Sequence, residues 1–161
     1  MRISEQIFPR AVALLGTCGK DGRPNLMSVS FIMPISFDPK YVAFSIAPHR
    51  FSYYNLQQVE EFTLNFLDTR QKELAAICGA YSGRDKDKFQ MCGLDPIRSR
   101  KVFPPVVYCP VSYECQVMDM KELGDHVLVV GAVLEEWVRR KDFTPLLHKG
   151  GSEYMSPVGL K

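Results

Sequence analysis

The sequence predicts a mainly β protein, an antiparallel barrel of about six strands with two short helices inserted. Apolar residues gather in short runs rich in β-branched and aromatic residues, with Gly, Pro and Asp at their ends. Only two segments have helical spacing, so the pattern lacks the helix after every strand that a parallel sheet requires. Short strands that follow one another through tight turns are typical of antiparallel barrels.

The first three predicted strands cover residues 11–18, 25–35 and 41–47. Asp21-Gly22 lies between the first two runs and indicates a hairpin, because glycine readily takes the positive φ of a tight turn. Pro39 and Pro48 bound the third run, as is usual at the ends of strands.

Two helices and three further strands follow. Ser52 is a suitable N-cap for a helix that ends near residue 60, and a second helix is predicted over residues 71–79. The remaining strands are predicted at residues 62–67, 111–120 and 126–138. The stretch 82–105 is rich in charge, Gly and Pro, and we interpret it as a long functional loop on a compact body.

Length and composition limit the functional classes. With 161 residues and 46% hydrophobic residues, the chain is expected to form a single domain over residues 1–161. Its 20 basic residues are interspersed with 18 acidic ones, which disfavours nucleic acid as a partner. No apolar run reaches the roughly 18 residues of a membrane span, and the N-terminus is not of the signal-peptide type. We therefore expect a soluble cytoplasmic protein.

The cysteines and histidines give no pattern of a metal site or a disulfide framework. The five cysteines are odd in number and contain no Cys-x-x-Cys pair, which favours buried free thiols in a reducing compartment. The three histidines lie far apart in the sequence, so we expect no bound metal.

A candidate anion site follows the third strand. Arg50 and Ser52 lie where the chain is expected to begin its first helix, and the unpaired N–H groups of a helix start favour an anion. An isolated Arg-x-Ser more often reflects a helix cap beside a solvated arginine, so this pattern alone leaves both interpretations open.

Several segments together resemble one family. From about residue 8 to 155 the chain is similar to the flavin reductase-like family with the FMN-binding split β-barrel. The matching segments, in the family's order, are residues 25–31, 44–48, 50–56, 61–65, 82–89, 124–126 and 147–154.

The resemblance implies a bound FMN and a set of residues that hold it. The isoalloxazine ring would lie against residues of two strands, the phosphate at Arg50 and Ser52, and the ribityl chain near Asn65, while His126 would lie on the nicotinamide side as the catalytic residue. The full expected set for the cofactor is Asn25, Met27, Ser28, Val29, Ser30, Ser45, Ile46, Ala47, Arg50, Ser52, Tyr53, Asn65, Lys86, Lys88 and Phe89.

Simpler roles for these residues stay open. Ser28 and Ser30 could be ordinary strand residues, and the Asn65 amide could support a neighbouring loop. The two lysines could be solvated charges, and His126 could be a turn histidine bonded to the backbone.

The resemblance further implies an FMN-dependent oxidoreductase that uses NAD(P)H as a transient donor and reduces flavin or ferric acceptors. The chain has no Gly-x-Gly-x-x-Gly fingerprint, so the nucleotide would dock over the flavin instead of on a Rossmann domain. One alternative is a flavoredoxin-like carrier that exchanges electrons with another redox protein, and another is a non-catalytic barrel that binds a ligand or a partner. The family also implies a homodimer.

Overall fold

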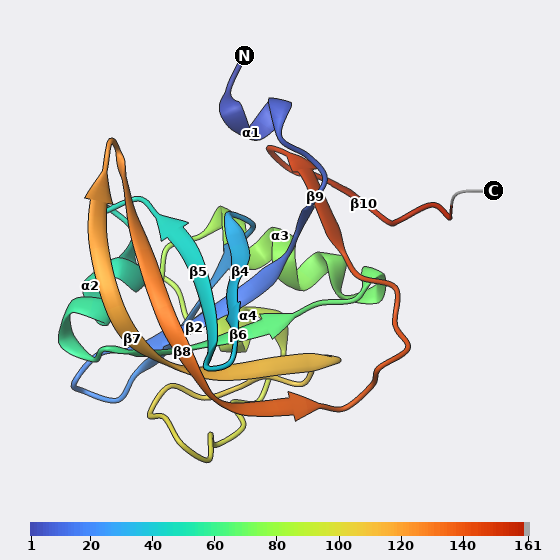
Figure 1. The fold of residues 1–161 in the computed structure, drawn as a ribbon. Coiled ribbons are helices and arrows are strands. Elements are labelled where there is room, and N and C mark those ends of the chain that lie inside the picture. The colour runs from blue at the N-terminus through green and yellow to red at the C-terminus, as the bar shows by residue number, and fades with distance from the viewer. Residues whose placement is uncertain (160–161) are drawn as a thin grey trace.

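The computed structural model describes residues 1–159 and contains two antiparallel sheets. The larger sheet has seven strands in the order β3-β2-β6-β7-β8-β5-β4, and the smaller has the order β1-β9-β10 (Figure 1). The strands of the larger sheet are β2 Ala13–Cys18, β3 Pro24–Val29, β4 Ile32–Phe37, β5 Lys40–Ile46, β6 Glu61–Phe66, β7 Val111–Leu123 and β8 His126–Val138. Those of the smaller are β1 Arg10–Ala11, β9 Leu147–Gly150 and β10 Glu153–Met155.

Five helical segments complete the described chain: α1 Ile3–Gln6, α2 Phe51–Gln58, the 3₁₀ segment η1 Thr69–Gln71, α3 Lys72–Ala80 and α4 Lys88–Cys92. Figure 1 shows α1 beside β9 and β10 at one end of the molecule, so the beginning of the chain and residues near its end lie together. No helix within residues 1–159 has the length and apolarity to cross a bilayer.

The mainly β fold with inserted helices is confirmed, but the predicted number of six strands is not. Seven strands share one sheet, three more form a second, and no closed barrel is detected among the described residues. The predicted strand over 25–35 is wrong as a single element: β3 pairs with β2, whereas β4 pairs with β5 at the opposite edge of the sheet. The chain changes partners at Ser30-Phe31, where the Ser45 N–H donates to the Phe31 carbonyl at 3.0 Å.

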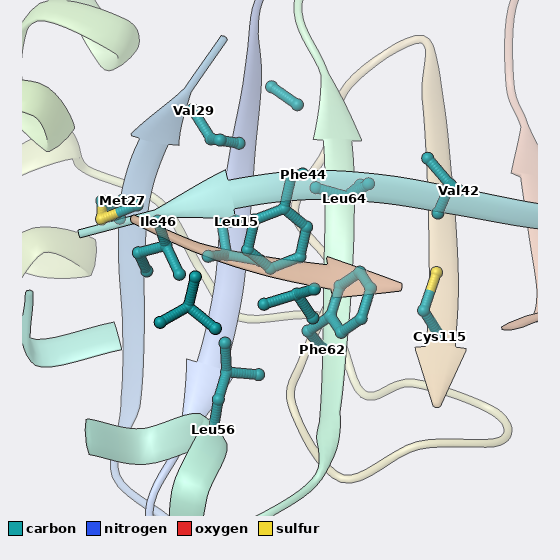
Figure 2. Close-up of a cluster of buried hydrophobic side chains, with 13 residues drawn as sticks. Leu15, Met27, Val29, Val42, Phe44, Ile46, Leu56, Phe62, Leu64 and Cys115 are labelled. Carbon is teal, nitrogen blue, oxygen red and sulfur yellow. The ribbon is translucent and has the colours of Figure 1, made fainter. Parts of the chain in front are cut away.

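The larger sheet curves around one apolar core. Side chains from six of its strands, β2, β3, β5, β6, β7 and β8, pack in a single cluster (Figure 2). Phe62 and Phe44 meet edge to face in this cluster, with ring centroids 5.0 Å apart. The two edge strands β3 and β4 follow each other directly in the chain, so the sheet must curve to bring its edges together. We call the region around Ser30-Phe31 the sheet seam.

Helices α3 and α4 cover the outer side of β2 and β3. Leu14 and Leu26 face away from the first core and join a second apolar cluster with Ala75 of α3 and Phe89 of α4. Every residue of β2 is therefore buried, since the strand is covered on both faces. This packing places the ends of α3 and α4 beside β3, close to the sheet seam.

Candidate functional site

Two neighbouring pockets lie beside β3. The first, of about 300 Å³, lies at the sheet seam and we call it the seam pocket; the second, of about 220 Å³, extends toward α3 and α4 and we call it the cationic pocket. Met27, His49 and Arg50 line both pockets. Together they form one site with two chemically different parts.

The seam pocket is built mainly from the ends of two strands. Its lining residues are Met27, Ser28, Val29, Ser30, Phe31, Ser45, Ile46, Ala47, His49, Arg50, Gly79 and His126. Because β3 is an edge strand that pairs only with β2, its other edge presents alternating N–H and C=O groups without a strand partner. Such an edge suits a flat ligand that carries both donors and acceptors.

The cationic pocket carries three positive side chains, Arg50, Arg84 and Lys88, and its lining contains no Asp or Glu. Arg50 is the N-cap residue of α2, and its guanidinium has no hydrogen-bond or ion-pair partner among residues 1–159. Lys88 is only 4% exposed and donates to the Cys78 carbonyl at 3.0 Å. Burial lowers the pKa of Lys88, and the nearby charge of Arg50 lowers it as well. An anion in this pocket would compensate both cations.

Ser52 and Asn25 add neutral polar groups to the same pocket. Ser52 is buried and its Oγ accepts from the Asn25 Nδ2 at 3.0 Å, which leaves the hydroxyl proton of Ser52 available to donate. The prediction that Ser52 is the N-cap is wrong, because Arg50 takes that position with an extended backbone. Ser52 therefore lies in the first turn of α2, where backbone N–H groups are unpaired.

The loop over the cationic pocket approaches β3 and α2 very closely at Gly83. A Cβ atom on Gly83 would lie 2.1 Å from Asn25 Oδ1 and 2.7 Å from Phe51 Cδ1, so only glycine fits there. The next residue, Arg84, donates to the His49 carbonyl at 3.0 Å, and its guanidinium lies over the Phe51 ring at 5.4 Å. These contacts hold the loop against the pocket.

His126 begins β8 and closes one side of the seam pocket. Its Nδ1 lies 2.7 Å from Asp125 Oδ1, and this hydrogen bond lowers the pKa of Asp125. The imidazole stacks on Phe31 with a centroid distance of 5.7 Å, and the Arg10 guanidinium lies 5.4 Å from the centre of the same phenyl ring. His126 is thus oriented by a carboxylate and an aromatic ring beside the pocket.

The structure brings most of the expected site residues together. The seam pocket contains Met27, Ser28, Val29, Ser30, Ser45, Ile46, Ala47, Arg50 and His126, and the cationic pocket adds Asn25, Ser52 and Lys88. Tyr53, Asn65, Lys86 and Phe89 line neither pocket.

The four residues outside the pockets have other surroundings. The Asn65 amide is fully buried, donates to the Leu14 carbonyl at 3.0 Å and accepts from the Val107 N–H at 3.0 Å, so it supports a neighbouring loop. Phe89 packs in the cluster beneath the helices, Tyr53 packs against the core of the sheet, and Lys86 is exposed. In this structure these four side chains lie outside both pockets.

Sequence reasoning missed several lining residues. Phe31 lies in the matched segment 25–31, and His49 directly precedes the matched segment 50–56. Their positions next to Ser30 and Arg50 could have identified them as lining residues. Arg84 lies in the matched segment 82–89, beside the lysines that were expected to hold the cofactor. Gly79 reaches the site only because α3 folds back onto β3, which no local pattern indicates.

Comparisons with known proteins agree with this geometry. A family model described as "Flavin reductase like domain" matches residues 4–155. A flavin reductase of Pseudomonas putida is 27% identical over 144 residues, covering 89% of this chain and 82% of that protein. An uncharacterized protein of Archaeoglobus fulgidus is 28% identical over 113 residues and 70% of this chain, and the match spans 64% of its length.

A solved structure is also similar over nearly the whole chain. The FMN-binding protein from Thermus thermophilus, solved with bound p-hydroxybenzaldehyde, has a TM-score of 0.88 and 27% identity, covering 98% of this chain and 91% of that one. With the family model matching residues 4–155 and the fold shared with an FMN-binding protein, this chain belongs to the flavin reductase like domain family.

Proposed function

We propose that this protein binds FMN and is an oxidoreductase that reduces flavin or ferric acceptors at the expense of NAD(P)H. The observation that carries the proposal is the pair of joined pockets, one bounded by the free edge of β3 and the other by three cations, with Arg50 lining both. FMN combines a flat heterocycle with a phosphate dianion, and each part matches one pocket. The similarity to an FMN-binding protein supports the same cofactor.

The residues fit the cofactor in their chemistry. Arg50, Lys88 and the Ser52 hydroxyl would hold the phosphate, and charge-assisted hydrogen bonds of this kind contribute about 1.5–3 kcal/mol each. Main-chain groups of Met27–Ser30 and Ser45–Ala47 would orient the ring. Lys88, whose ammonium is desolvated before any ligand binds, supports an anion more strongly than a solvated lysine would.

Bound FMN would supply the redox chemistry by taking two electrons from a nicotinamide and passing them to an acceptor. The chain's own contribution is to bind and orient the cofactor and to shape the surface beside it. We assign His126 to the donor side, because its ring closes the seam pocket and is held by Asp125 and Phe31.

Anaerobic mixing tests this function directly. Purified protein is expected to carry a flavin absorbance band that NADH or NADPH bleaches within seconds. A flavin that only a reduced ferredoxin-type carrier can bleach would replace the reductase by an electron carrier of the flavoredoxin kind. If the purified protein is colourless and takes up no added FMN, the remaining interpretation is a non-catalytic binding module.

The position of Gly83 allows a prediction about the loop. Gly83→Ala is expected to weaken FMN binding by about tenfold or more, because the methyl group must displace Asn25 or lift the loop that carries Arg84. Fluorescence titration with FMN measures the effect. Asp85→Ala is the matched control, since Asp85 is exposed in the same loop and lines neither pocket. Equal affinities of the two variants would contradict the close approach.

We also propose that the functional unit is a homodimer. The edge strand β4 and the N-terminal segment 3–7 expose large apolar side chains, with Met33 55%, Ile35 45%, Ile3 63% and Ile7 61% exposed. Ile3, Ile7 and Met33 line a further apolar pocket of about 320 Å³, together with residues of β5. Removing such a surface from water by a second copy would stabilise the pair.

Light scattering coupled to size exclusion tests the dimer. The protein is expected to elute with twice the mass of the chain, and Met33→Lys combined with Ile35→Lys is expected to halve that mass. Met118→Lys is the control, because Met118 is equally exposed but lies on β7. A monomeric parent protein would refute the proposal.

A further inference from the structure

Two cysteines that are distant in the sequence meet beside the cationic pocket. The Sγ atoms of Cys78 and Cys92 are 3.7 Å apart, and both thiols are free. Cys78 is buried in the last turns of α3, whereas Cys92 is half-buried at the end of α4. A disulfide needs an S–S distance of about 2.05 Å, so a small rotation of the side chains would bring the sulfurs within bonding range.

The segment between these cysteines carries the loop that covers the cationic pocket. It includes Gly83, Arg84 and Lys88, and Cys78 itself lines the pocket. Lys88 donates to the Cys78 carbonyl at 3.0 Å, so the polar contact between α3 and α4 lies next to the two sulfurs. A bond between the sulfurs would therefore join both ends of the covering loop.

We propose that Cys78 and Cys92 form a reversible disulfide when a hydroperoxide oxidises them, and that this bond slows release of the phosphate-bearing ligand from the cationic pocket. The first part depends only on the two thiols. The second part rests on the proposed binding of FMN.

The reaction is balanced with hydrogen peroxide as the oxidant. The sulfur of Cys92 attacks one peroxide oxygen, the O–O bond breaks, and the products are a sulfenic acid on Cys92 and one water. The sulfur of Cys78 then attacks the Cys92 sulfur, the S–O bond breaks, and a second water leaves. The two thiols together lose two electrons and two protons, and an external thiol reverses the step by exchange.

Cys92 is assigned the first step because it is the more accessible thiol and has the more favourable surroundings. Burial raises the pKa of Cys92, but its hydrogen bond with Cys78 and the positive charge of Lys88 oppose that effect. Burial also raises the pKa of Cys78, and there the neighbouring Cys92 raises it further, while the charge of Lys88 opposes both effects only in part. Cys78 therefore suits the second, resolving step.

Mass spectrometry tests the bond itself. Protein treated with hydrogen peroxide, then denatured and alkylated, is expected to retain three of its five reactive thiols, with an intact mass about 2 Da lower before alkylation. Trypsin can cut at Arg84, Lys86 or Lys88, so the cross-linked peptides are distinguishable from the reduced ones. Dithiothreitol is expected to restore all five thiols.

Matched variants identify the pair. Cys92→Ala and Cys78→Ala should lose the cross-link, while Cys18→Ala, which removes a buried thiol of β2, should keep it. Circular dichroism checks that each variant is folded. If Cys92→Ala is unfolded, Cys92→Ser takes its place. Five alkylated thiols after oxidation, or a cross-link between other cysteines, would overturn the proposal.

Release of FMN tests the consequence. Oxidised parent protein is expected to release FMN severalfold more slowly than reduced protein, and the rate of Cys92→Ala should not change with peroxide. Equal rates in the oxidised and reduced parent would overturn the coupling to the pocket. If the protein binds no FMN, the proposed function fails, whereas the thiol measurements still decide whether the disulfide forms.

Discussion

Replacing Arg50 with alanine is expected to weaken FMN binding by about 10- to 150-fold while the fold is retained. Arg50 lines both pockets, and its guanidinium has no partner among the described residues, so its hydrogen bonds are free for the ligand phosphate. The range corresponds to one charge-assisted hydrogen bond of about 1.5–3 kcal/mol. Flavin fluorescence quenching measures the affinity, and circular dichroism reports the fold.

Two controls separate the phosphate contact from other effects. Riboflavin lacks the phosphate, so its affinity should be the same for the parent protein and Arg50→Ala. Lys86→Ala should bind FMN as the parent does, because Lys86 is exposed and lines neither pocket. If Arg50→Ala binds FMN as tightly as the parent, our placement of the phosphate is wrong.

Phe62→Ala is expected to lower the free energy of unfolding by about 3–5 kcal/mol. The Phe62 ring is fully buried and meets Phe44 edge to face at 5.0 Å. Gly131 of β8 offers no side chain, and a Cβ there would lie 2.4 Å from Phe62 Cζ, so the Phe62 ring occupies the space beside Gly131. Removing it leaves a cavity that the strands cannot collapse to fill.

Urea unfolding of the cofactor-free protein measures this loss. Phe103→Ala provides the comparison, since its ring is 58% exposed and the change should cost about 1 kcal/mol or less. Similar unfolding midpoints for the two variants would show that Phe62 does not lie at the centre of the core.

The sequence predicted most of the fold because the strands have strong local signals. The long runs that form β7 and β8 and the turn at Asp21-Gly22 are evident from composition and spacing alone. The division between β3 and β4 was missed because Ser30-Phe31 contains no Gly or Pro, and the break comes from the change of pairing partner. The small sheet was missed because strands of two to four residues are too short to show alternation.

The sequence predicted which segments lie at the site, but it did not predict which way individual side chains of a helix point. The family resemblance implied that Lys86 and Lys88 both help to hold the cofactor. The Asp87 side chain accepts from the Gln90 N–H at 3.1 Å and caps α4, which turns Lys88 inward and leaves Lys86 exposed. Asn65 matched the family's pattern, yet its amide is committed to the Leu14 carbonyl and the Val107 N–H. Side-chain direction of this kind is decided by tertiary packing.

The sheet seam has a consequence for heat resistance. Strands β3 and β4 are not hydrogen-bonded to each other, although residues from both sides of the seam line one pocket. A ligand seated there would bridge β3 on one side and the end of β5 on the other, so its binding energy would add to the stability of the native state. The melting temperature should therefore rise with FMN concentration, and substitutions that impair cofactor retention would look like folding defects unless cofactor-free samples are compared.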